Sequence, residues 1–277
     1  MKHYQHALIA VDLFENYLPF VQRAISFAAH HAQKVTVVHA TPLLPTLAPY
    51  AIDIQEELAS DAQNRMRALK ASLAQKTAAK IEFISQTGNP KYVISTVAKE
   101  QQVDLIICGS HGKHGFSLLL GSTANALVHT AACDVLTIRL DLEGNCLVPH
   151  ENYKRMLLAT DFFKDGARVT NTFFTLAKRH LTDAAVITVI PDAAMLAVAY
   201  MPSLEAEIEN QARTHMNELQ AAHGMTATQT GVRAGQPKLE ILNAAEAHQA
   251  DLIVVGSHGR GAIASLLLGS TANAILH

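Results

Sequence analysis

The sequence predicts an α/β protein made of two tandem domains, each a doubly wound parallel sheet. The chain has 277 residues, which is enough for two domains of ordinary size. The decapeptide SLLLGSTANA stands at 117–126 and again at 265–274, which indicates an internal duplication. Within each copy, short apolar runs alternate with longer amphipathic segments, as they do where strands are joined by helices.

Other positions repeat at nearly the same spacing and set the expected domain limits. Asp12 recurs as Asp161, which is 149 positions later. A polar stretch containing glycine and proline separates the two copies. We therefore expect a first domain over 1–141 and a second domain over 152–277.

The first copy is expected to alternate five strands with four helices. The runs HALIAVD and KVTVVHA are apolar and partly β-branched, which suits buried parallel strands. The segment between them has Leu18, Val21, Ile25 and Ala28 spaced for one helical face. The expected elements are strand 6–12, helix 16–32, strand 34–40, a long helix burying Ala62, Met66, Leu69 and Leu73, strand 81–86, helix 90–101, strand 103–109, helix 122–131 and strand 134–140.

The second copy is expected to repeat this order with one difference. Its strands are expected near 154–160, 184–190, 225–233 and 250–256, with helices between them. The sequence ends at His277 inside the last expected helix, without a counterpart of strand 134–140. We therefore expect this copy, as given, to lack its last strand and to be C-terminally incomplete. Either the natural chain continues or this copy contributes one strand fewer.

Composition excludes several classes of protein. Hydrophobic residues make up 49% and charged residues 17%, so a disordered chain is not expected. The 22 basic and 24 acidic residues leave no basic excess for nucleic acid or an anionic membrane, and no apolar run is long enough to span one. We do not expect the start to be a signal peptide, and the three cysteines show neither CxxC spacing nor a disulfide framework. We expect a cytoplasmic protein.

Two features of each copy are expected at the ligand-binding edge of the sheet. Ligands of open α/β sheets bind beyond the carboxyl ends of the strands, where the strand order reverses. The acidic residue after the first strand and the glycine loop after the fourth are expected at that place. Glycine lets the backbone approach an anion, and the amides of a helix's first turn favour phosphate. We expect Ser270 to cap such a helix. The plainer alternative is that Gly-Ser-Thr only ends a loop and starts a helix.

The glycine loop carries a resemblance to a known family. Residues 256–270, GSHGRGAIASLLLGS, match the pattern G-x2-G-x9-G-[S/T] found after strand four in universal stress proteins that bind ATP. The opening strand, helix and strand are also similar to that family. The chain resembles a tandem universal stress protein of the E type, and the resemblance covers both copies. It implies the adenine nucleotide alpha hydrolase-like form of the doubly wound fold.

The resemblance implies an adenine nucleotide site in the second domain. The expected ligand is ATP or another adenine nucleotide, with or without Mg²⁺. Asp161 is expected beside the adenosine, and backbone groups of Val189 beside the adenine. The remaining expected contacts are Gly256, His258 and Gly259 on the ribose and α-phosphate side, and Gly269, Ser270 and Thr271 at the β- and γ-phosphates.

The first domain departs from the family pattern. Between Gly112 and Gly121 it has eight residues instead of nine, and one residue of extended chain spans about 3.3–3.6 Å. It also has Ala40 where the second domain has Val189. We therefore expect the second domain to be the main site. The corresponding first-domain positions are Asp12, Ala40, Gly109, Gly112, Gly121 and Ser122.

Other enzyme classes lack their signatures in this sequence. No GxGxxG follows the first strand, and no GxxxxGK[ST] or GxSxG occurs, which argues against a dinucleotide oxidoreductase, a P-loop NTPase and an α/β-hydrolase. Fifteen histidines are present but no HExxH, and we expect no metal site. Only His258 and Arg260 stand near the expected phosphates, so we expect no catalytic residue and at most slow ATP hydrolysis.

Two functions follow from these observations. In the first, the protein takes part in the stress response and binds an adenine nucleotide, chiefly in the second domain, with a regulatory role. In the alternative, it binds no nucleotide and acts as a stress scaffold or carries another small apolar ligand. The resemblance also implies that the two domains pair within the chain through edge strand 134–140, with a homodimer as a further assembly.

Overall fold

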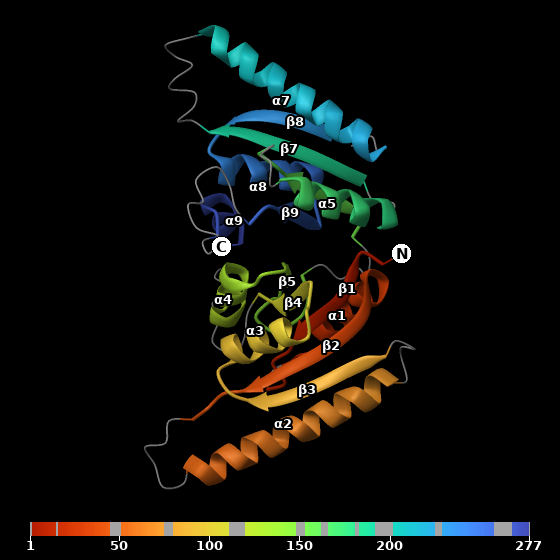
Figure 1. The fold of residues 1–277 in the computed structure, drawn as a ribbon. Coiled ribbons are helices and arrows are strands. Elements are labelled where there is room, and N and C mark those ends of the chain that lie inside the picture. The colour runs from red at the N-terminus through yellow and green to blue at the C-terminus, as the bar shows by residue number, and fades with distance from the viewer. Residues whose placement is uncertain are drawn as a thin grey trace. The chain divides into compact units, whose positions relative to one another are not determined.

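The computed structural model divides the chain into two compact units, Met1–Glu151 and Asn152–His277. Each unit is an α/β domain with its own sheet (Figure 1). The structure describes residues 2–14, 16–44, 51–74, 80–110, 120–147, 153–161, 166–180, 183–191, 202–224, 229–257 and 268–276.

The first domain is a five-stranded sheet in the order β3-β2-β1-β4-β5, and every neighbouring pair is parallel. Its elements are β1 (Tyr4–Ala10), α1 (Leu18–His31), β2 (Ala32–Thr41), α2 (Ala51–Ala74), β3 (Ile81–Thr87), α3 (Pro90–Glu100), β4 (Leu105–Gly109), α4 (Ser122–Thr130) and β5 (Asp134–Ile138). The expected strands and helices are all present, with ends that move by a few residues.

The second domain is a four-stranded parallel sheet in the order β8-β7-β6-β9. Its elements are β6 (Arg155–Ala159), α5 (Gly166–His180), β7 (Asp183–Pro191), α7 (Pro202–His223), β8 (Gln229–Gly235), α8 (Pro237–His248), β9 (Leu252–Val255) and α9 (Ser270–Leu276). The predicted doubly wound fold is confirmed in both copies, and so is the smaller sheet of the second.

The strand order places helices on both faces of each sheet (Figure 1). The chain first moves outward from β1 to β3 and then returns to the other side of β1 to form β4. Because parallel crossovers are right-handed, this reversal sends the later helices to the opposite face. Accordingly α3 contacts α4, and in the second domain α5 contacts α7 while α8 contacts α9.

An aliphatic core supports the first sheet. Leu8 and Ile9 of β1 and Ile107 of β4 are fully buried. Helix α2 covers the sheet with the apolar residues that its sequence pattern predicts, namely Ala62, Met66, Leu69 and Leu73. Leu18 is an exception to the predicted face of α1, because it is the first residue of that helix and stays 44% exposed.

The fourth strands of the two domains differ in burial. Strand β4 is buried except for its last residue, since β5 pairs with its outer edge. All four residues of β9 are only half-buried. Within the described part of the chain, β9 pairs with β6 alone.

A recurring aspartate fastens the start of each sheet. The Asp104 carboxylate accepts hydrogen bonds from the backbone N–H groups of Gln5 (2.8 Å) and His6 (2.9 Å). Asp251 does the same for Lys154 (2.6 Å) and Arg155 (3.1 Å). Each carboxylate therefore links the residue before the fourth strand of its domain to the beginning of the central strand.

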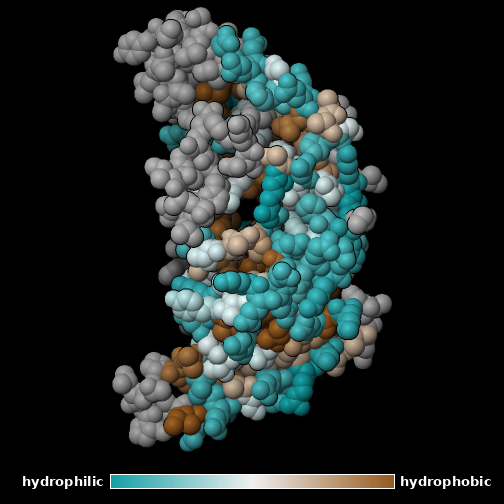
Figure 2. Space-filling view, in the orientation of Figure 1, coloured by the Kyte–Doolittle hydropathy of each residue, from teal (hydrophilic) through white to brown (hydrophobic). Residues whose placement is uncertain are grey.

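Hydrophilic side chains cover most of the described surface on the face that Figure 2 draws. Among the described residues, no helix combines the length and the apolar character needed to cross a membrane. The three cysteines are free, and Cys108 of β4 is buried.

Candidate functional site

The strand order reverses once in each sheet, between β1 and β4 and between β6 and β9. Ala10 pairs with Cys108 at the first reversal, and Ala159 pairs with Val255 at the second. The chain leaves both strands of each pair at the same edge. The predicted sites therefore begin at neighbouring strand ends in both domains.

The two strand-end aspartates lie just beyond their strands. Strands β1 and β6 end two residues before Asp12 and Asp161. Asp12 is exposed, and its carboxylate accepts a hydrogen bond from the backbone N–H of Phe14 (3.0 Å). Asp161 is half-buried. The less exposed carboxylate therefore belongs to the second domain.

Equivalent backbone hydrogen bonds hold both aspartate turns. The N–H of Val11 donates to the carbonyl of Val38 (2.9 Å), and the N–H of Thr160 donates to that of Ile187 (3.0 Å). These bonds extend the pairing of the central strand with its neighbour past the last strand residue. The turn carrying the carboxylate thus starts from the same backbone geometry in both domains.

The expected adenine positions lie in the adjacent strands. Ala40 is buried near the end of β2 and pairs with Gln86. Val189 lies at the corresponding place in β7, is half-buried, and pairs with Arg233. Both lie at the carboxyl edge of their sheet, where the sequence places them.

The glycine loops are closed at their bases by matching hydrogen bonds. The Gly121 N–H donates to the carbonyl of Ser110 (2.6 Å), and the Gly269 N–H donates to that of Ser257 (2.7 Å). Gly109 ends β4 and Gly256 directly follows β9, so each loop starts at the strand edge. The one-residue difference in loop length lies between these closing bonds.

Three predicted contacts lie inside the loops. Gly112, His258 and Gly259 are outside the described residues.

A correction concerns the serines at the start of the following helices. Helices α4 and α9 begin at Ser122 and Ser270 themselves. Asn125 and Asn273 donate their N–H groups to the carbonyls of Gly121 (2.8 Å) and Gly269 (2.9 Å), so glycine holds the cap position. The prediction that Ser270 caps the helix is therefore wrong. Ser270 and Thr271 instead belong to the first helical turn, whose amide groups have no partner within the helix.

A buried histidine at this edge of the first domain was not found from the sequence. His39 of β2 is 2% exposed, and its Nδ1 lies 3.0 Å from the carbonyl oxygen of Val11. Burial lowers the pKa of His39, opposed by the Val11 hydrogen bond and the nearby Asp12 charge. The backbone N–H of Leu13 points at the same ring nitrogen from 3.3 Å, so Nδ1 of the neutral ring faces one acceptor and one donor of the turn. Thr188 takes this place in the second domain.

An arginine of α2 completes the surroundings of the first-domain turn. Arg65 donates a hydrogen bond to the backbone carbonyl of Leu13 (3.2 Å) and is held by Asp61 (2.8 Å). Its guanidinium carbon lies 5.7 Å from the centre of the Phe14 ring, a cation–π arrangement. The Phe14 ring in turn meets His39 edge-on at 5.2 Å between centroids. This contact set ties α2 to the turn that carries Asp12.

The remaining candidate groups do not assemble a reactive site in the described part of the chain. No three His, Cys, Asp or Glu side chains converge there as ligands for a metal. Burial raises the pKa of the Cys108 thiol to about 12, which keeps it protonated and unreactive. A hollow of about 150 Å³, lined by Arg213, Met216, Asn217, Gly231 and Val232, lies between α7 and edge strand β8, away from the strand-order reversal.

The fold and the strand-end sites together define the class of protein. It is a duplicated doubly wound α/β protein with a glycine loop at the reversal point of each sheet. The model of the universal stress protein family matches residues 3–139 and 152–277, and the chain belongs to this family. Both domains are thus universal stress protein domains in tandem.

Relatives occur as single-domain and as two-domain proteins. Universal stress protein A homolog 2 of Coxiella burnetii is 36% identical over 146 residues, which are 50% of this chain and 98% of the relative. A universal stress protein of Mycolicibacterium smegmatis is 25% identical over 282 residues, covering 97% of this chain and 92% of the relative. The Mycolicibacterium smegmatis protein therefore matches both domains.

Solved structures show the same fold over the whole chain. A universal stress protein from Archaeoglobus fulgidus has a TM-score of 0.68 at 23% identity and covers 99% of this chain and 93% of its own. A protein of unknown function from Pseudomonas aeruginosa has a TM-score of 0.70 at 16% identity, with 99% and 89% covered.

Proposed function

We propose that this universal stress protein binds ATP or another adenine nucleotide, chiefly in the second domain, and that binding has a regulatory rather than a catalytic role. The supporting observation is the arrangement at the β6–β9 reversal. Half-buried Asp161 follows one strand, and Gly256 follows its neighbour. The bond between Gly269 and Ser257 brings the first turn of α9 back to the start of the loop.

The residues at this edge suit the chemistry of the ligand. A carboxylate such as Asp161 accepts hydrogen bonds from ribose hydroxyls. The first-turn amides at Ser270 and Thr271 are donors for phosphate oxygens. The loop pattern at 256–270 matches that of the family members that bind ATP, and Mg²⁺ bound with ATP would offset the charge of its phosphates.

The test is nucleotide binding to the full chain, measured by isothermal titration calorimetry with ATP, with and without Mg²⁺. We expect one strongly bound nucleotide per chain. Asp161→Asn should weaken ATP binding by about tenfold, because an amide replaces a charged acceptor and this costs about 1–2 kcal/mol. Gly259→Val should weaken binding further if the loop backbone approaches the phosphates.

A matched substitution in the first domain serves as the control. Asp12→Asn makes the same chemical change at the equivalent strand end, and we expect it to leave the strong site almost unchanged. Equal losses from both variants would contradict the assignment to the second domain. Absence of any ATP binding by the unmodified chain would favour the alternative, a scaffold or a carrier of another apolar ligand.

The finer features of this function are also proposals. We expect ATP turnover, measured as phosphate release, to be far slower than one per second, because general base and metal groups needed for hydrolysis are not evident in the sequence. Pairing of the two domains through strand 134–140, a homodimer, and residence in the cytoplasm are proposed from the family resemblance.

A further inference from the structure

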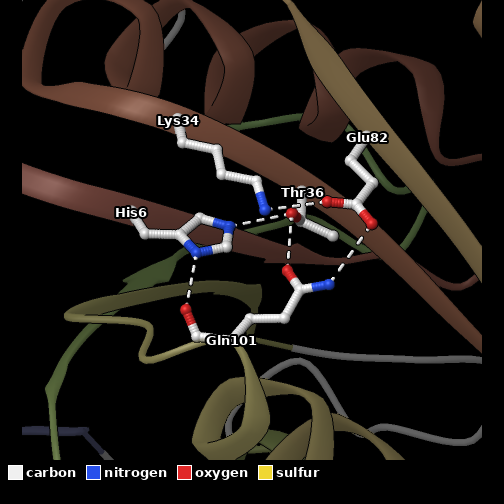
Figure 3. Close-up of polar contacts among 5 residues, drawn as sticks. All are labelled: His6, Lys34, Thr36, Glu82 and Gln101. Atoms are coloured by element: carbon white, nitrogen blue, oxygen red, sulfur yellow. Dashed lines mark hydrogen bonds and ion pairs between the residues drawn. The ribbon is translucent and has the colours of Figure 1, made fainter.

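Five polar side chains form a hydrogen-bonded chain across the sheet of the first domain, near the beginnings of its strands (Figure 3). They come from β1 (His6), β2 (Lys34 and Thr36), β3 (Glu82) and the residue that directly follows α3 (Gln101). His6 is 5% exposed and Thr36 is fully buried. The two are therefore shielded from water at one end of the chain, whereas Lys34 and Glu82 are about half exposed at the other.

The ion pair of Lys34 and Glu82, at the exposed end of the chain of contacts, determines the orientation of the Gln101 side-chain amide. Lys34 lies 2.9 Å from Glu82, and its hydrogen bond is the largest cause of a lowered pKa for that carboxyl, so Glu82 is a charged acceptor. A carboxylate has no proton to give, so the Gln101 atom facing it at 3.4 Å must be the donating Nε2. The other amide atom, Oε1, then faces Thr36 and can only accept.

This orientation determines the protons on His6. The Thr36 hydroxyl donates its single proton to Oε1 of Gln101 (3.0 Å). It therefore has only lone pairs for Nε2 of His6, which lies 2.8 Å away and must donate. The other ring nitrogen, Nδ1, faces the backbone carbonyl of Gln101 at 3.0 Å, and a carbonyl also only accepts. Both ring nitrogens of His6 are therefore donors, which is the cationic form.

The second domain holds the corresponding helix end with a permanently charged side chain, through a carbonyl one residue further along the chain. Arg155 has the position of His6 in the central strand, whereas Gln249 corresponds to Gln102, because both have a left-handed backbone conformation and matching hydrogen bonds to the preceding helix. The Nε–H of Arg155 donates to the backbone carbonyl of Gln249 (3.1 Å). A cation at the carboxyl end of a helix is favourable because the last carbonyls carry partial negative charge. Ala185 stands where the first domain has Thr36, so the arginine needs no further partner in its strand.

We propose that His6 is a proton-dependent clamp, which in its doubly protonated form fastens the carboxyl end of α3 to β1 and β2. Loss of one proton removes one bond whichever nitrogen loses it. If Nδ1 loses its proton, its lone pair faces a lone pair of the Gln101 carbonyl oxygen and that hydrogen bond is lost. If Nε2 loses its proton, the Thr36 hydroxyl donates to Nε2 instead, and Oε1 of Gln101 is left without a donor. His6 therefore holds the end of α3 more firmly at low pH than at high pH, whereas Arg155 holds the end of α8 at both.

The charges around His6 are compatible with a cationic ring. From β2 the neighbour in register is Lys34, whose charge is matched by Glu82 of β3. From the segment before β4, Asp104 accepts the backbone N–H of His6. Lys99 and Glu100 in the last turn of α3 are exposed and opposite in charge. These groups sum to one net negative charge, which favours a positive imidazole among them.

The test compares thermal unfolding of the full chain with that of His6→Arg, which copies the second domain, and His6→Gln. We measure at about pH 5.5 and about pH 8.5, on either side of the range in which histidine titrates. From about pH 5.5 to about pH 8.5, we expect the melting temperature of the first domain to change in both proteins. It should fall by about 2–4 °C more in the unmodified chain than in His6→Arg. Arg155→Gln is the matched control and should lower the second-domain midpoint equally at both pH values.

A second measurement keeps the proposal testable if a variant fails to fold. Long-range ¹H–¹⁵N spectra of the unmodified chain report the protons on each imidazole, and the His6 signals are those absent from whichever of His6→Arg and His6→Gln folds. We expect two ring N–H protons on His6 at about pH 5.5, both slow to exchange because the ring is buried. Only one ring proton at that pH, or a midpoint difference from His6→Arg that does not change with pH, would overturn the proposal.

Discussion

Two buried histidines of the first domain have different hydrogen-bonding surroundings. His6 has acceptors facing both ring nitrogens. His39 has a backbone carbonyl facing Nδ1, and among the described residues no hydrogen-bond partner reaches Nε2. Burial therefore holds His39 in the neutral form, and its pKa is lowered from the ordinary value of 6.5.

The lowered pKa of His39 predicts a loss of stability in acid. Below about pH 6.5 the unfolded chain binds a proton that the folded chain does not, so the free energy of unfolding falls as the pH falls. His39→Thr, which copies Thr188, should remove this dependence. We expect urea unfolding between pH 7 and about pH 5.5 to show a steeper loss in the unmodified chain, by up to roughly 1.4 kcal/mol per pH unit. Parallel curves for the two proteins would contradict the prediction.

A glycine at the start of α3 is required for steric reasons. Gly88 has φ +156°, and a Cβ there would lie 2.8 Å from Cγ2 of Val93, which is buried on α3. Gly88→Ala should destabilise the first domain by about 1–3 kcal/mol, measured by urea unfolding. Gly231→Ala is the control, because a Cβ at Gly231 meets nothing within 4 Å. A similar small effect of both substitutions would show that α3 moves to accept the methyl group.

At the scale of elements, the recurring aspartate couples the start of the central strand to the strand beside it. Asp104 accepts two backbone N–H groups, and an asparagine would keep one acceptor oxygen. We expect Asp104→Asn to lower the free energy of unfolding of the first domain by about 1 kcal/mol and Asp104→Ala by about 2–3 kcal/mol. Hydrogen exchange at the amides of Gln5 and His6 should rise in the same order. Unchanged exchange at these amides would contradict this role of the carboxylate.

The elements themselves could be predicted more fully than the contacts between them. The apolar run 6–12 locates β1 to within two residues, and the spacing of Ala62, Met66, Leu69 and Leu73 identifies the buried face of α2. The role of Asp104 was not predicted from the sequence. Val-Asp precedes the fourth strand in the first copy, and Ala-Asp precedes it in the second. The partners of Asp104 lie 98 and 99 residues away, and no local pattern reports which backbone amides a carboxylate will meet after folding.

The same limit applies to the candidate site. The duplication and the strand pattern predict that Asp161 and Gly256 follow neighbouring strands at one edge of the sheet, because parallel strands deliver their carboxyl ends to one edge. The cap of α9 was assigned one residue too late, since serine and glycine both suit that position. His39 could not be recognised as a buried neutral group, because its burial depends on Phe14 and on helix α2 lying over the same turn.

At the scale of the whole molecule, each compact unit has its own sheet and core, and we expect each to fold alone. Fragments 1–151 and 152–277 should both give cooperative thermal transitions by circular dichroism. The second should melt at the lower temperature, because β9 is only half-buried whereas β4 is almost wholly buried. A fragment 152–277 that melts above fragment 1–151 would contradict this ranking.

The hydrogen bonds that close the glycine loops have a consequence for how the two domains can diverge. Ser110 and Gly121, like Ser257 and Gly269, hold the two ends of the intervening chain together. A residue can be gained or lost between them while the strand before and the helix after keep their positions. Duplication followed by loop exchange could therefore give the two halves of one polypeptide different ligand preferences on an unchanged scaffold.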